Sequence, residues 1–193
     1  SPATPRSEPL RLNGEALELL EASIDGAPIA ESSRAIEDDH LVIANVPDTF
    51  ELELVTRCSP QANSALSGLY VSNGNFYTQC EAEGFRRITF FPDRPDVMTR
   101  YRVTLRAERQ CSPVLCTWED PFPKPSYLFA LVAGKLAVTE STFMRRSGRP
   151  ALLQVWVEPG NEHKTDHAMR SLERSIRWDE ERYGLELDLD RFM

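Results

Sequence analysis

The chain between Leu10 and about Val138 is a succession of short apolar, β-branched or aromatic segments separated by turn residues. This feature restricts the possible folds more than any other. Residues 50–54 (Phe-Glu-Leu-Glu-Leu) alternate strictly, so a strand there has one apolar face and one acidic face. Short, evenly spaced segments of this kind are typical of an antiparallel all-β domain. The pattern therefore predicts a mainly β fold.

One hairpin and several further strands can be placed from the same pattern. Within residues 69–78, Asn73-Gly74 separates two strand-like halves, and this pair favours the positive φ angles of a type I′ turn. The remaining predicted strands cover residues 41–46, 50–54, 87–91, 101–105, 127–132 and 152–157.

Between Thr165 and Tyr183 the apolar period changes from two to 3.6. Met169, Leu172 and Ile176 then fall on one stripe, which Tyr183 extends, and Gly184 follows as a natural C-terminal stop. The segment therefore predicts one amphipathic helix.

Charge and composition exclude two classes of partner. The 193 residues carry a formal net charge of −8, which is the wrong sign for a protein that neutralises phosphates, so we expect no nucleic acid. No apolar run approaches the roughly 18 residues of a membrane helix, and residues 1–8 lack a signal-peptide core. Four sparse cysteines favour a reduced state. We therefore expect a cytoplasmic protein without a membrane partner.

The sequence contains no complete catalytic apparatus. His163 and His167 have the spacing of two metal ligands on a helix, but the zinc-protease motif requires Glu where Lys164 stands. Exposed, solvated histidines are therefore predicted. Cys111 and Cys116 lack a second pair of ligands, which argues against a zinc site there. A nucleophile elbow and a phosphate-binding glycine loop are also missing from the sequence.

A polar run directly after the apolar hairpin is the strongest candidate site. Gln79, Glu81 and Glu83 follow one another at alternate positions. A carboxylate beside an amide oxygen can accept hydrogen bonds from an ammonium group, which suggests a cation-holding site. Gln79 and Glu81 are two residues apart, so in extended backbone they point to the same side. The alternative reading is an exposed loop whose charged groups are solvated or paired.

Four stretches together resemble the aminopeptidase N type of zinc metallo-aminopeptidases, most closely its bacterial-like branch. They are residues 78–91, 93–98, 118–134 and 178–186, and the match runs from Pro9 to Met193. The resemblance implies a saddle-like, antiparallel β-sandwich domain followed by the first strands and one helix of a thermolysin-like catalytic domain. It divides the chain into a tail (1–9), the N-terminal β domain (10–135) and a partial start of the catalytic domain (136–193).

The resemblance also implies roles for individual residues. Glu81 binds the free α-amino group of the substrate, Gln79 lines the same first subsite, and the Glu81–Ala82 peptide is cis. Substrate binding is thus assigned to Glu81 and Gln79, whereas no catalytic residue or metal ligand is expected in this chain. The parent protein uses zinc to remove single N-terminal residues from peptides, so the implied partners are peptide N-termini and the remainder of the catalytic domain.

The family's HExxH motif and its G-A-M-E-N motif are expected beyond Met193, so residues 1–193 are predicted to be inactive alone. The family also has a longer segment before Trp118, and the sequence leaves open whether the short connection from Leu115 is a deletion or an omission. Residues 136–193 lack their usual neighbours, so we expect an exposed apolar patch and self-association through Trp156, Met169, Leu172 and Ile176.

Two other functions remain open from the sequence. The first is a non-catalytic β-sandwich module that binds a protein partner through Tyr70, Phe76 and Tyr77 of the hairpin. The second is a degenerate family member kept as a scaffold. The sequence that follows Met193 discriminates among these readings.

Overall fold

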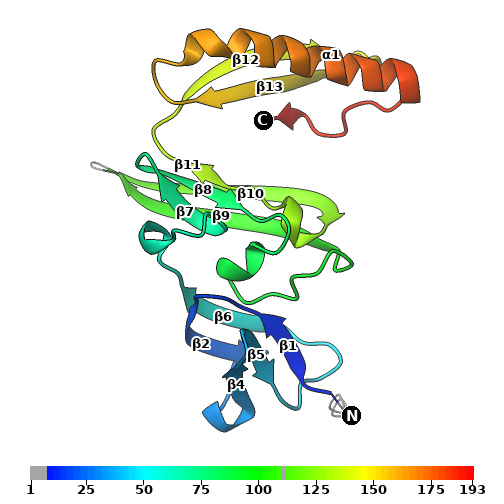
Figure 1. The fold of residues 1–193 in the computed structure, drawn as a ribbon. Coiled ribbons are helices and arrows are strands. Elements are labelled where there is room, and N and C mark those ends of the chain that lie inside the picture. The colour runs from blue at the N-terminus through cyan, green and yellow to red at the C-terminus, as the bar shows by residue number, and fades with distance from the viewer. Residues whose placement is uncertain (1–7, 110–111) are drawn as a thin grey trace. The chain divides into compact units, whose positions relative to one another are not determined.

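The computed structural model describes residues 8–109 and 112–193, which divide into two compact units, one up to Val132 and one from Ala133 (Figure 1). Most regular elements are strands in open antiparallel sheets, and the described residues contain one α-helix. The mainly β fold with one helix is therefore confirmed. Short 3-10 turns connect several strands, among them η1 (Glu31–Ser33), η2 (Pro60–Ala62) and η5 (Glu162–Lys164).

The first unit begins with two three-stranded sheets. One has the order β1 (Leu10–Asn13), β5 (His40–Ile43), β4 (Arg34–Glu37). The other has the order β3 (Ala27–Pro28), β2 (Glu18–Ile24), β6 (Leu52–Arg57). Every pairing in these two sheets is antiparallel.

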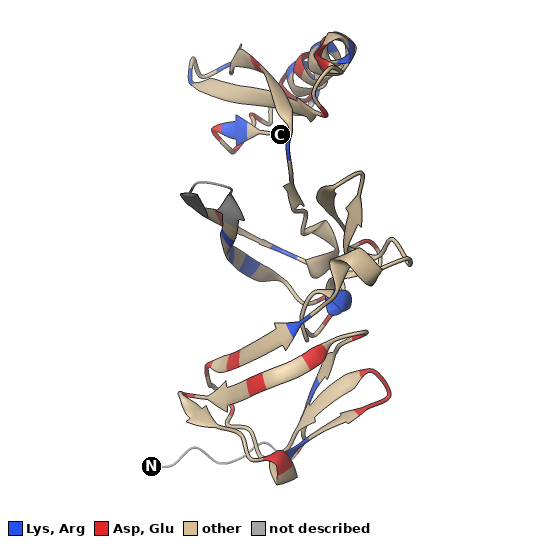
Figure 2. Cartoon of the chain, turned by 90° about the vertical axis from the view of Figure 1, so that its left-hand side faces the viewer, with Lys and Arg blue, Asp and Glu red and all other residues tan. Residues whose placement is uncertain are grey.

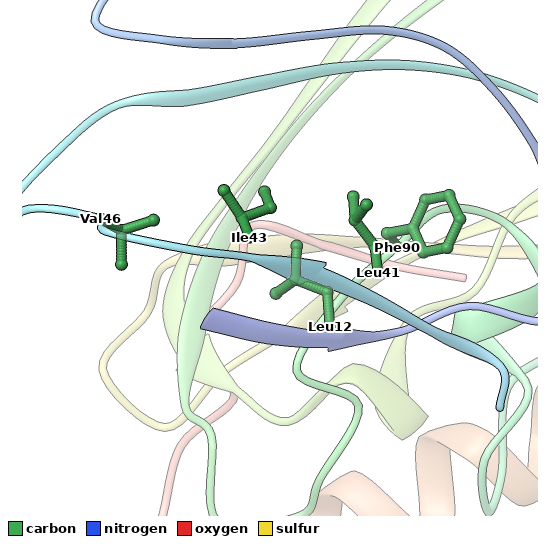
Figure 3. Close-up of a cluster of buried hydrophobic side chains, with 5 residues drawn as sticks. All are labelled: Leu12, Leu41, Ile43, Val46 and Phe90. Atoms are coloured by element: carbon green, nitrogen blue, oxygen red, sulfur yellow. The ribbon is translucent and has the colours of Figure 1, made fainter. Parts of the chain in front are cut away.

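An apolar cluster lies at the core of these sheets (Figure 3). Its buried members are Leu12, Leu41, Ile43, Val46 and Phe90. Residues Phe50, Leu52 and Leu54 pack against the cluster, whereas the glutamates between them are exposed. The alternation at residues 50–54 thus gave the correct inward face, because successive strand side chains point to opposite sides.

The predicted hairpin is confirmed as β7 (Gly68–Ser72) and β8 (Asn75–Gln79), with β11 (Val132–Ala133) along the other edge of β8. Asn73 has a φ of 50° and Gly74 a φ of 77°, the two positive values that a type I′ turn needs. The β4 and β5 strands are joined in the same way, because Asp38 and Asp39 also have positive φ.

A long ribbon of β9 (Thr99–Arg109) and β10 (Ser112–Lys124) completes the sheets of this unit. The predicted strand at 101–105 lies inside β9, and Leu115 to Trp118 is part of β10 rather than a connection. The β9/β10 register shifts between Asp120 and Lys124, where two prolines interrupt the pairing. Figure 2 shows basic positions along β9 and acidic positions on β2 and β6.

Two predicted strands are wrong. Residues 87–91 follow a 3-10 turn, η3 (Phe85–Arg87), and make only an isolated bridge between Asn13 and Phe91. Most of residues 127–132 lie in and after the 3-10 turn η4 (Ser126–Leu128). The cause is an aromatic cluster: the Phe85 ring lies 5.0 Å from Phe91 and 5.2 Å from Phe129 in edge-to-face contacts. Phe91 and Phe129 belong to this aromatic cluster, and Phe90 belongs to the core cluster around Leu41, so these residues do not line one face of a sheet.

The second unit is a sheet covered by a helix (Figure 1). Strands β12 (Ala137–Met144) and β13 (Pro150–Val157) are antiparallel, and the short β14 (Arg191–Phe192) runs parallel to β13. The helix α1 (Thr165–Tyr183) has the bounds that the sequence predicts, and β13 contains the predicted strand 152–157. Gly184 ends the helix with a φ of 70° and donates to the Glu180 carbonyl.

The prediction of an exposed patch is wrong for the helical residues. Met169 and Ile176 are each only 7% exposed, because they pack with partly buried Leu172 against Phe143 of β12 and against β13. Folding the helix onto the sheet satisfies the apolar stripe within the unit. Trp156, in contrast, is 44% exposed. Self-association through the remaining exposed side chain stays a prediction.

Candidate functional site

The candidate site is the turn that follows β8, here called the Glu81 loop and defined as residues 80–84. Strand β8 ends at Gln79, and the Gly84 amide donates to the Cys80 carbonyl at 2.8 Å, which closes the turn. The Glu81–Ala82 peptide is cis, as the resemblance implied. The loop therefore departs from extended backbone directly after Gln79.

Gln79 and Glu81 are brought together, but not by strand alternation. The Gln79 side-chain amide, Nε2, donates to the Glu81 backbone carbonyl at 3.0 Å. The sequence argument assumed extended backbone through residue 81, and this assumption is wrong because the strand has already ended. The amide of Gln79 is thus held over the same loop that presents Glu81.

The loop has two buried ends and an exposed middle. Cys80 is 2% exposed and Gly84 is buried, whereas Glu81, Ala82 and Glu83 are exposed. A Cβ atom at Gly84 would lie 2.1 Å from the Gln79 carbonyl oxygen, so only glycine fits this close approach. The two buried ends fix the loop, and its middle faces solvent.

The two exposed carboxylates of the loop have different surroundings. Glu83 pairs at 3.2 Å with Arg86, whose side chain is largely buried. No described residue forms a hydrogen bond or ion pair with the Glu81 carboxylate. Within the described residues Glu81 is therefore an exposed acceptor without a partner, and an ammonium group is a chemically suitable donor to such an acceptor.

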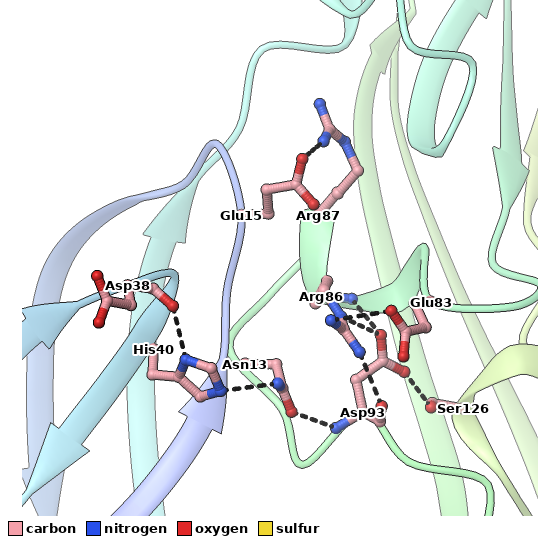
Figure 4. A network of polar contacts seen from close by, with 9 residues as sticks. All are labelled: Asn13, Glu15, Asp38, His40, Glu83, Arg86, Arg87, Asp93 and Ser126. Carbon is pink, nitrogen blue, oxygen red and sulfur yellow. Dashed lines mark hydrogen bonds and ion pairs between the residues drawn. The ribbon is translucent and has the colours of Figure 1, made fainter.

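Beneath the loop, Asp93 is the centre of a polar network (Figure 4). Its Oδ2 accepts from the Arg86 backbone amide and from Arg86 Nε, both at 3.1 Å. Its Oδ1 accepts from the Ser126 hydroxyl, and its own backbone amide donates to Asn13 Oδ1 at 3.1 Å. Asp93 is only 3% exposed, so this buried carboxylate is fully supplied with donors.

The network continues from Asn13 to His40. The carbonyl of Asp38 can only accept, so His40 Nδ1 carries the hydrogen in their 2.7 Å contact. His40 Nε2 then accepts from Asn13 Nδ2 at 3.1 Å. His40 thus connects the β4/β5 turn to the end of β1, which is a structural role.

Burial changes the acidity of two groups near Asp93. Burial, and secondly the negative charge of Asp93, raise the pKa of the Cys80 thiol to about 11. Burial, followed by the charges of Asp93 and Cys80, raises the pKa of Tyr101 to about 12. Both groups therefore stay protonated at neutral pH, and the Cys80 thiol is a poor nucleophile.

The other sequence candidates form no site. His163 and His167 are both exposed, and Cys111 lies outside the described residues. Across residues 8–109 and 112–193, no three His, Cys, Asp or Glu side chains gather closely enough to hold a metal ion. In the same residues, no helix has the length and apolar character needed to cross a membrane.

Sequence reasoning missed Asp93, Asn13 and Ser126. Asp93 lies in one of the four stretches that carry the family resemblance, but no local pattern marked it as a buried centre. An aspartate between two prolines and an arginine reads as an exposed turn. Arg86 and Asp93 have opposite charges and lie seven residues apart, but outside a helix this spacing does not predict a contact.

Comparison with known proteins gives consistent matches. No family model matches the chain. Aminopeptidase N of Caulobacter vibrioides is 47% identical over 97% of the chain, and aminopeptidase N of Escherichia coli is 45% identical over 96%. The crystal structure of Legionella pneumophila aminopeptidase A in complex with aspartic acid matches with a TM-score of 0.87 at 32% identity, over 96% of this chain and 24% of that one. The chain spans about a quarter of the two curated relatives, 24% and 23%.

Proposed function

Because the chain belongs to the aminopeptidase N family, as part of its N-terminal region, we propose that the full-length protein is a zinc-dependent aminopeptidase that removes single N-terminal residues from peptides. The observation that carries this proposal is the match to aminopeptidase N over more than nine-tenths of the chain, at 45–47% identity. The free carboxylate of Glu81 adds a chemical reason, since an exopeptidase must recognise a chain end.

In this function Glu81 binds the α-ammonium group of the substrate. The α-amino group has a pKa of about 8, so it is mostly cationic at neutral pH and complements a carboxylate. Fixing the ammonium sets the distance to the first peptide carbonyl, and only a free N-terminus meets that requirement. Gln79, whose amide hydrogen-bonds to the Glu81 carbonyl, lines the same subsite.

The zinc ion of this family has no fitting ligand set among the described residues of this chain. When bound elsewhere in the full-length protein, zinc would polarise the first peptide carbonyl and activate water. We assign residues 136–193 to the beginning of the catalytic domain, whose remainder is then an intramolecular partner. The contribution of residues 1–193 is to bind and orient the N-terminus.

The coding sequence after Met193 tests the enzyme against the binding-module alternative. The aminopeptidase proposal expects an HExxH motif with a downstream glutamate, and a G-A-M-E-N motif, in the residues that follow. A coding sequence that contains neither motif would exclude catalysis and leave the Tyr70, Phe76 and Tyr77 surface as the candidate binding site.

A substitution in the full-length protein tests the role of Glu81. We expect Glu81→Gln to lower kcat/KM on alanyl substrates about 10- to 100-fold, because a hydrogen bond to a charged group contributes about 1.5–3 kcal/mol. Glu83→Gln is the matched control: it removes the same charge from the same loop, its side chain is 68% exposed, and Arg86 keeps its bonds to Asp93 when this pair is lost. Unchanged kinetics in Glu81→Gln, or equal losses in both variants, would refute the role.

A further inference from the structure

The Glu81 loop makes few contacts that could fix the direction of its carboxylate. Its own bonds, from Gln79 to the Glu81 carbonyl and from Gly84 to Cys80, are local. Local bonds fix the shape of a turn but not its orientation on the protein. The orientation therefore comes from the segments on both sides of the loop: β8, which pairs with β7 up to Gln79, and the residues that follow the loop.

After the loop, Phe85 packs in the aromatic cluster with Phe91 and Phe129, and Arg86 makes the directional hydrogen bonds. Its backbone amide and Nε both bond to Asp93 Oδ2, and its Nη2 donates to the Asp93 carbonyl at 3.1 Å. Its backbone carbonyl accepts from the Glu15 amide at 3.0 Å. Three of these four bonds are made to Asp93, so Asp93 is the main hydrogen-bond partner that positions Arg86.

Asp93 in turn joins segments that are far apart in the sequence (Figure 4). Ser126 of η4 donates to its carboxylate across 33 positions, and its amide donates to Asn13 of β1 across 80. Its side chain is 1% exposed, so water cannot replace a lost partner at low cost. The Asp93 charge also acts on Cys80, which directly precedes Glu81, since it contributes to the raised pKa of that thiol.

We propose that Asp93 is a positioning residue for substrate binding: through Arg86, it holds the Glu81 loop in the orientation that lets the Glu81 carboxylate receive the substrate's ammonium group. This inference rests on the proposed function of Glu81. Asp93 itself is buried, so its side chain is not accessible for direct contact with a substrate. Its effect must therefore pass through Glu81, and this requirement makes the inference testable.

The readout is the contribution of the amino group to binding, measured on the full-length protein. Alanine hydroxamate and propionohydroxamate share the metal-binding group, and only the first carries the α-amino group. The ratio of their inhibition constants therefore reports recognition of the amine. We expect Glu81→Gln to abolish this preference, and Asp93→Asn to reduce it about tenfold while changing propionohydroxamate binding less than twofold.

Two further variants separate positioning from general destabilisation. In a Glu81→Gln background, Asp93→Asn is expected to cause no additional loss of preference, because residues that act as one unit are not additive. Asp96→Asn is the matched control: Asp96 is three residues away and pairs with Arg94, but its side chain is 61% exposed. We expect this control to behave like the wild type.

Arg86→Lys covers the case in which Asp93→Asn does not fold, which circular dichroism would show. Lysine keeps the positive charge but loses the Nε and Nη2 bonds to Asp93, so the same selective loss of preference is expected. Equal losses for both hydroxamates, or a full additional loss in the Glu81→Gln background, would overturn the inference. A preference that survives Glu81→Gln would instead refute the proposed role of Glu81, and the inference with it.

Discussion

The helix of the second unit and the Glu81 loop of the first are positioned by different forces. Helix α1 is held by a repeating apolar stripe, whose buried members Met169 and Ile176 pack on the sheet beneath. The Glu81 loop is held by buried polar groups, with Asp93 at their centre. Apolar packing is non-directional and tolerates small shifts, whereas hydrogen bonds depend on distance and angle.

The difference shows which parts of this chain need a precisely fixed side-chain orientation. A helix that covers a sheet needs only complementary surfaces, and its packing energy is distributed over several contacts. A carboxylate that must meet one ammonium group needs an orientation fixed within a few tenths of an ångström. We therefore expect substitutions in the helical unit to change stability, and substitutions around Asp93 to change recognition as well.

Leu153→Ala is the substitution with the largest expected effect on the helical unit. Leu153 is fully buried between the sheet and α1, so its truncation should lower the free energy of unfolding of this unit by about 3 kcal/mol. Urea unfolding followed by the helical circular dichroism signal measures the loss. Leu152→Ala, at a half-buried position, is the control and should cost less than about 1.5 kcal/mol. Equal losses of unfolding free energy in the two variants would contradict the distinction between the helix-covered face of β13 and its opposite face.

Gly84→Ala is the corresponding test of the loop. The added Cβ would meet the Gln79 carbonyl oxygen at 2.1 Å, and overpacking of this kind costs about 2 kcal/mol. In the full-length protein we also expect weaker binding of alanine hydroxamate, because the loop must shift. The control is Gly74→Ala in the β7/β8 turn, which has open space around the new Cβ and costs only the strain of its positive φ. Loss of stability without loss of binding would contradict the claim that the conformation of this loop controls recognition.

The same contrast explains how much the sequence could predict. Helix α1 and the Asn73-Gly74 hairpin are specified by residues within a few positions of one another, and both were placed correctly. Residues 87–91 looked like a strand, but Phe91 joins an aromatic cluster with Phe85 and Phe129, and the last two are more than 40 positions apart. Local pattern cannot reveal such a cluster, because its members share no period.

The candidate site divides in the same way. Glu81 and Gln79 stand out as polar residues after an apolar hairpin, and the family resemblance supplied their proposed roles. Asp93 became visible only when the fold brought Asn13 and Ser126 to it. Buried polar centres are assembled from distant positions, so a single sequence shows their members without showing their contacts.

Tyr101→Phe has the smallest expected effect and tests the apolar side of the Asp93 region. The Tyr101 hydroxyl is buried and has no hydrogen-bond partner among the described residues. Its removal should therefore leave the fold intact and stabilise it by about 1 kcal/mol near neutral pH. The ring contacts with Phe85 and Phe129 are kept in the variant.

The pH dependence of this variant gives a second readout with a definite sign. The Tyr101 pKa is raised to about 12 in the folded protein, against about 10 in an unfolded chain. Between these values the unfolded state has lost the proton and the folded state retains it, so wild-type stability falls as pH rises. Tyr101→Phe lacks this loss, and its advantage over the wild type should grow from pH 10 to pH 12. An advantage that stays constant with pH would show that the Tyr101 hydroxyl is not held in a buried environment.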